Sequence, residues 1–148
     1  MDGVDSGCNG RLRDGVTLDE ARAELATLRK TAADPAVAAL RLEFNSSGQV
    51  LGIASEVLAG QIAAAEGDLT GAVARLREAA RLEDEMVYGE PPEWTVPVRH
   101  DLGAALLRAG LAAEAETVYR ADLARFPENV WSLAGLAESL TTPAPARR

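Results

Sequence analysis

The sequence has a single cysteine, Cys8, and a single histidine, His100, among its 148 residues. One cysteine cannot form an intramolecular disulfide. With a single histidine, the chain lacks the residues for a histidine-based metal site or nucleophile triad. A glycine-rich phosphate loop with its lysine and a G-x-S-x-G motif are also missing. We therefore expect a protein that is not an enzyme, with no catalytic residues, no metal ligands and no cofactor.

Basic residues and long apolar runs are also scarce. Lys and Arg number 15 against 23 Asp and Glu, which gives a formal net charge of −8. This balance argues against nucleic acid and anionic membranes as partners, and it suits either a basic partner or simple solubility. No apolar run approaches the roughly 20 residues that span a membrane, and the first residues lack the basic start of a signal peptide. We expect a cytoplasmic protein.

Aromatic residues make up only 4%, whereas Ala and Leu, which are strong helix formers, supply most of the apolar content. The composition therefore predicts an all-α fold. Apolar residues at helical spacing predict helices over residues 17–33, 36–44, 49–66, 69–83, 97–109, 112–125 and 129–140. Thr17 and Glu20 form a capping box at the first of them. Residues 1–16 and 141–148 are expected to be flexible tails around one helical domain, 17–140.

Two of the expected helical hairpins share one pattern of small and large residues. The first hairpin contains Gly60, Gly67, Ala72 and Leu76, and the second contains Gly103, Gly110, Ala115 and Tyr119 at identical spacing. The first glycine of each set lets the second helix approach closely, and the second glycine suits a turn with positive φ. The alanine marks the closest approach of the two axes, and the large residue fills the space between hairpins.

This pattern resembles the tetratricopeptide repeat, a helix–turn–helix unit of about 34 residues. The stretch from Leu102-Gly103 through Tyr119 to Pro127 is similar to that family's consensus, and the likeness covers about residues 50–140. Three features depart from it: Asp122 stands where a small residue is usual, Asp84 stands near the place of a closing proline, and the loop between the hairpins is longer by about nine residues. Residues 88–106 also look like the C-terminal part of larger bacterial repeat proteins without an assigned activity.

The resemblance implies antiparallel hairpins in a right-handed superhelical array, with a concave face lined by the first helix of each repeat. We expect this face to bind a protein or peptide, as a scaffold or adaptor would. Its candidate residues are Val57, Gln61, Ala64, His100, Ala104, Leu107, Arg108, Trp131 and Glu138. Of these, Trp131 is expected to pack against the preceding hairpin. The alternative is a self-associating structural module, because a short array leaves apolar ends that need covering.

The irregular stretch 84–96 offers a second set of candidates. Tyr88 and Trp94 either anchor this loop on the helices or form one wall of a binding groove. Five carboxylates around it, Glu83, Asp84, Glu85, Glu90 and Glu93, are either solvated loop charges or an attraction for something basic. The residues alone do not decide between these alternatives.

Overall fold

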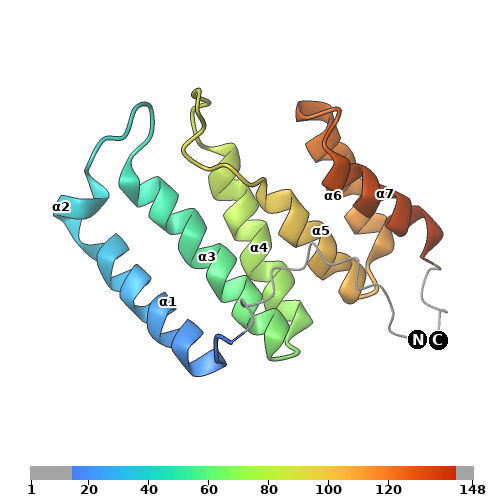
Figure 1. Ribbon diagram of the computed structural model, residues 1–148, viewed down its shortest axis with the longest axis horizontal. Coiled ribbons are helices and arrows are strands. Elements are labelled where there is room, and N and C mark those ends of the chain that lie inside the picture. The colour runs from blue at the N-terminus through green and yellow to red at the C-terminus, as the bar shows by residue number, and fades with distance from the viewer. Residues whose placement is uncertain (1–14, 143–148) are drawn as a thin grey trace.

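A computed structural model describes residues 15–142, and every regular element in that range is a helix. The helices are α1 (Leu18–Ala33), α2 (Pro35–Ala38), α3 (Ser47–Ala65), α4 (Leu69–Asp84), α5 (Val98–Arg108), α6 (Ala112–Arg125) and α7 (Val130–Thr141) (Figure 1). This confirms the all-α prediction. Residues 1–14 and 143–148 lie outside the described range, and with them Cys8 and most of both expected tails.

The helices begin and end at the signals that the sequence contains. Thr17 and Glu20 form the predicted capping box, in which the Thr17 hydroxyl accepts from the Glu20 N–H and the Glu20 carboxylate accepts from the Thr17 N–H. Gly67 and Gly110, in the turns after α3 and α5, have φ of 86° and 75°, a conformation that costs glycine little. The predicted turn positions are therefore confirmed.

One expected helix is wrong. Periodicity predicts a helix over residues 36–44, but α2 ends at Ala38 and the chain turns through residues 39–46. The Ser47 hydroxyl donates to the Val37 carbonyl, and an isolated bridge joins Arg41 to Ser46. A helix of this length is marginal by itself, so contacts with the rest of the chain decide its end. Leu40 and Phe44 are consequently exposed rather than packed along one helix side.

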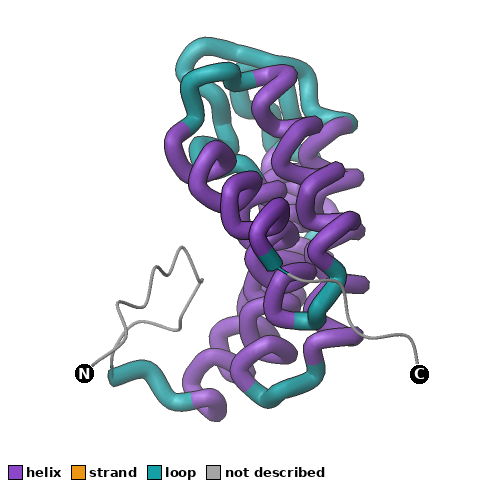
Figure 2. The backbone as a smooth tube through the Cα atoms, turned by 90° about the vertical axis from the view of Figure 1, so that its right-hand side faces the viewer, coloured by secondary structure: helices purple, strands orange, loops and turns teal. Residues whose placement is uncertain are grey.

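The helices form successive antiparallel hairpins, with α3 paired to α4 and α5 paired to α6 (Figures 1 and 2). Helix α4 also contacts α5, and α6 also contacts α7, so each second helix joins two neighbouring hairpins. Helices α3 and α5 meet directly, as do α5 and α7, whereas α4 and α6 are joined only through long side chains, in the ion pairs Asp84–Arg125 and Arg77–Glu114. At the other end, α1 packs along α3, and α2 bridges α1 and α3.

Small residues at the helix crossings allow this close packing. Ala72 and Ala115 are completely buried, which agrees with their expected place at the closest approach. A Cβ atom added to Gly60 would lie 2.7 Å from Leu76 Cγ, and one added to Gly103 would lie 2.3 Å from Tyr119 Cζ. Both large side chains therefore occupy space that only glycine leaves open.

Candidate functional site

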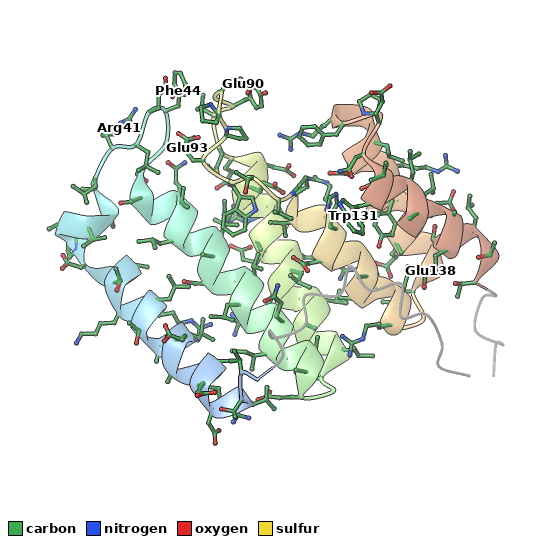
Figure 3. The ribbon with its side chains drawn as sticks, viewed as in Figure 1. Arg41, Phe44, Glu90, Glu93, Trp131 and Glu138 are labelled. Carbon is green, nitrogen blue, oxygen red and sulfur yellow. The ribbon has the colours of Figure 1, made fainter. Side chains whose placement is uncertain are left out.

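Asn45, in the turn between α2 and α3, holds the long loop between α4 and α5. The Asn45 side chain is buried, donates to the Val87 carbonyl and accepts from the Val87 N–H, both at 2.8 Å. It also donates to Glu93 Oε2 at 3.0 Å. The amide of Phe44 donates to the Glu93 carboxylate and, with Asn45, holds the pKa of Glu93 below its ordinary value. Figure 3 shows Phe44, Glu90 and Glu93 at this common end.

The base of the loop is fixed by an ionic cluster. Asp84 accepts from both terminal nitrogens of Arg99, at 2.9 and 2.7 Å, and pairs with Arg125 at 3.0 Å. The hydrogen bonds from Arg99 lower the pKa of Asp84. Burial raises the pKa of the neighbouring Glu83, although the Val98 N–H donates to it. These carboxylates therefore join the C-terminal end of α4, where the loop begins, to α5 and α6.

Three of the five acidic residues singled out in the sequence, Glu83, Asp84 and Glu93, make such contacts within the fold. A fourth, Glu85, pairs with Arg81 on its own helix. Of the five, only Glu90 makes neither an ion pair nor a side-chain hydrogen bond with another residue of the described range. The cluster is thus mainly structural, and the Glu90 carboxylate is exposed.

A cleft of about 950 Å³ opens between this loop and the turn that joins α6 to α7. We call it the loop cleft. Its walls are mostly apolar and include three aromatic rings and three prolines. The residues that line it are Glu83, Met86, Val87, Tyr88, Gly89, Glu90, Pro92, Glu93, Trp94, Thr95, Pro97, Arg125, Phe126, Pro127, Glu128 and Asn129. The loop is therefore one wall of a groove, in agreement with one of the two sequence interpretations.

The two aromatic residues of the loop have different roles. Trp94 is partly buried and packs against the hydrophobic core, so it anchors the loop. Tyr88 is 61% exposed and forms an open wall of the loop cleft. Phe126, on the opposite wall, is 40% exposed and lies within reach of the Arg125 guanidinium, 5.8 Å from its ring centre. Trp94 therefore anchors the loop, whereas Tyr88 forms an open wall of the cleft.

Beneath this turn lies a polar cluster of His100, Asp122, Asn129 and Ser132. Asp122 Oδ2 accepts from Ser132 Oγ at 2.5 Å and from Asn129 Nδ2 at 3.0 Å, and it lies 3.5 Å from His100 Nε2. Burial raises the pKa of Asp122, but the interactions with His100 and Ser132 outweigh it, so that the pKa is lowered. The cluster therefore joins α5, α6 and α7.

The residues expected on the concave face are only partly brought together. Gln61, Ala104 and Arg108 line one shallow hollow of about 20 Å³ between α3 and α5, where Arg108 Nη2 donates to the Ala64 carbonyl at 3.0 Å. Val57 is buried and His100 is nearly so, because the first belongs to the core and the second to the polar cluster. Neither offers its side chain to a ligand as the fold stands.

The remaining candidates lie on partly covered or open surface. Leu107 packs against the core and is half-buried. Trp131 and Glu138 are exposed on α7 (Figure 3). The expectation that Trp131 packs against the preceding hairpin is wrong, because its side chain is 56% exposed. Small Ser132 and Gly135 occupy the packed side of α7 instead.

No protein-family model, curated protein or solved structure matches this chain. Within residues 15–142, no cluster of three or more His, Cys, Asp or Glu side chains could hold a metal ion. None of the helices in that range is long and apolar enough to cross a membrane.

Replacing Asn45 with alanine is expected to release the loop. The change removes three hydrogen bonds at once and leaves the Val87 N–H and carbonyl without partners. Hydrogen–deuterium exchange of residues 85–97 should accelerate by about tenfold or more, since that corresponds to a local loss of about 1.4 kcal/mol. Exchange in the middle of α6 provides the internal control. Unchanged loop exchange would show that Trp94 packing and the ionic cluster hold the loop without Asn45.

Proposed function

We propose that this chain is a tetratricopeptide-type binding module that holds an extended segment of a partner protein in the loop cleft. The repeat spacing supports the architecture. So do the contacts of α3 with α5 and of α5 with α7, because their backbones approach more closely than those of α4 and α6, as in an array that curves toward the α3, α5 and α7 layer. The finding that carries the binding proposal is the loop cleft itself.

The size and lining of the loop cleft suit a peptide. Its volume of about 950 Å³ lies near the upper end of the roughly 300–1,000 Å³ typical of binding pockets. Tyr88 and Phe126 keep large exposed ring surfaces on opposite walls. Exposed aromatic rings supply contact area at a low cost in side-chain entropy, which is why they dominate recognition surfaces. An apolar or proline-containing stretch would fit between them.

The charges around the cleft favour a basic flank on that stretch. Glu90 and Glu128 make no ion pair within the described residues, whereas Arg125, the one cation of the lining, is already paired with Asp84. The rim is therefore negative, in keeping with the net charge of −8. A Lys or Arg side chain could pair with either carboxylate and lie over the Tyr88 ring. We accordingly favour a partner segment with apolar or proline residues next to a basic one.

Substitution of Tyr88 or Phe126 with alanine is expected to weaken peptide binding by about tenfold or more without unfolding the protein, because both rings are exposed. The measurement is fluorescence titration of a Trp131→Phe protein, in which Trp94 is the only tryptophan and lies in the cleft. The probes are an array of ten-residue peptides, proline-containing or not, in basic, neutral and acidic versions.

Leu111→Ala is the matched control, since Leu111 is 39% exposed against 40% for Phe126 and does not line the cleft. Glu90→Gln combined with Glu128→Gln should weaken only the basic probes, and less so at high salt. Binding that survives the loss of both rings, or a preference for acidic probes, would exclude the loop cleft in this role.

The face of α3, α5 and α7 is the competing location, and Arg108 distinguishes the two. Arg108 lies in the small hollow between α3 and α5, away from the loop cleft. Arg108→Ala should leave peptide binding unchanged if the loop cleft is the site. If Arg108→Ala loses binding while the Tyr88 and Phe126 variants still bind, the binding site lies on the face of α3, α5 and α7.

A further inference from the structure

Helix α7 exposes most of its large apolar residues, although Leu136 packs against the core. The positions buried against the preceding hairpin are Ser132, Gly135 and Ser139. The exposed residues include Val130, Leu133, Ala137 and Leu140, which we call the α7 stripe. These four follow one another at steps of three, four and three residues, the spacing of a helix–helix seam. A helix that presents such a seam to water lacks a partner helix.

The preceding hairpin shows what such a face normally meets. In α5, Leu102, Gly103 and Leu106 are buried, and Gly103 lies against Tyr119 of α6. One repeat later, a shift of about 34 residues, the corresponding α7 positions are 136, 137 and 140. Ala137 and Leu140 are exposed there, because no described helix follows α7. The face is thus a packing surface by its register as well as by its composition.

We propose that the α7 stripe binds the α7 stripe of a second copy of this chain, with the two helices antiparallel about a twofold axis at residue 135. The stripe is symmetric about that point, since positions 130 and 140 are equally far from it, as are 133 and 137. The twofold axis therefore places Val130 opposite Leu140 of the second copy. It places Leu133 opposite Ala137, so that a large side chain meets a small one at both central contacts.

The charges of α7 agree with this antiparallel pairing. Glu138 is the only ionisable side chain between Val130 and Thr141, and it lies beside the stripe rather than in it. The twofold axis brings it level with residue 132 of the second copy, in the first turn of that helix. The unpaired N–H groups of a helix N-terminus attract a carboxylate. A parallel pair would instead place Glu138 of each copy level with Glu138 of the other, at the helix C-termini, where a carboxylate is unfavourable.

The seam is short, so the association should depend on concentration. A helix of 12 residues is about 18 Å long, and one such pair buries less than the roughly 800 Å² per partner of a standard stable interface. Light scattering after size-exclusion chromatography, with the full chain loaded from about 1 µM to about 1 mM, should show a shift from monomer to dimer. A monomer throughout that range would overturn the proposal.

Two charge variants test the pairing and its direction. Val130→Glu and Leu140→Lys each place an uncompensated charge in the seam, and each should weaken the dimer by about tenfold or more. Both changes add the sign of charge that their own helix end favours, so neither should unfold the monomer. An equimolar mixture should restore dimers, because the carboxylate introduced at position 130 of one copy then faces the ammonium group introduced at position 140 of the other. The second contact of that mixed dimer keeps Leu140 against Val130. A parallel seam could not be restored in this way.

The control variant is Leu40→Lys. Leu40 and Leu140 are both 58% exposed, but Leu40 lies in the turn after α2. Leu40→Lys should leave the dimer intact. Dimers that persist in both α7 variants, or that disappear equally in Leu40→Lys, would place the contact elsewhere. A mixture that stays monomeric would overturn the antiparallel register.

Discussion

Replacing Asp122 with alanine is expected to lower the free energy of unfolding by about 3–5 kcal/mol, the usual cost of breaking a buried charged network. Asp122 is only 1% exposed and accepts from Ser132 and Asn129 while facing His100. Its removal leaves donors from α5 and α7 without their common acceptor. Chemical denaturation at neutral pH measures the loss, and Glu138→Ala, an exposed carboxylate on α7, should change stability by no more than about 0.5 kcal/mol.

The same carboxylate should make stability depend on pH in the acidic range. The pKa of Asp122 in the folded protein is lowered, so the folded state favours the ionised form. Its contribution is therefore fully present above the unfolded-state pKa of about 3.9, and it is lost as the pH falls through the folded-state value. Denaturation curves of the native protein and of Asp122→Asn should converge on acidification. Equal loss in both proteins would assign the acid sensitivity to other carboxylates.

The sequence predicts most of the fold because its signals are local. Thr17 with Glu20, and the turn glycines Gly67 and Gly110, act within a few residues of themselves, and the structure has them where the sequence predicts. The wrong helix over 36–44 is the instructive exception. The turn that replaces most of it is anchored at Asn45, whose partners Val87 and Glu93 lie more than 40 residues away. Periodicity contains no information about such a pairing.

The candidate site is harder to predict for the same reason. The sequence marks Tyr88 and Trp94 as candidates, but the opposite wall of the loop cleft is Phe126, which the sequence marks only as the end of a helix. The repeat register predicts that His100 faces a ligand. It is instead held beside Asp122, a residue whose burial is visible in the sequence only as a departure from the repeat pattern. A charged residue where the repeat resemblance predicts a small one is such a signal, because a buried charge needs hydrogen-bond partners.

Replacing Gly103 with alanine is expected to cost about 3 kcal/mol, the upper part of the range for overpacked cores. The Tyr119 ring lies between two helices, so that a Cβ atom at Gly103 would be 2.3 Å from Tyr119 Cζ and one at Gly135 would be 2.2 Å from it. The ring cannot move away from one glycine without meeting the other. Gly52→Ala is the matched control, because its Cβ would meet only Leu82 Cδ1 at 3.7 Å. The Gly52→Ala substitution should raise the free energy of unfolding by up to about 1 kcal/mol, because alanine has the higher helix propensity.

A double-mutant cycle with Tyr119→Ala identifies the cause of that cost. Tyr119→Ala alone should lose about 3–5 kcal/mol, because it empties a buried aromatic site. In that background Gly103→Ala no longer meets the ring, so it should become neutral or stabilising as Gly52→Ala is. The coupling energy between the two positions should therefore nearly equal the penalty of Gly103→Ala in the native protein. A penalty that persists without the ring would mean that the backbone, and not the wedged tyrosine, sets the distance between α5 and α6.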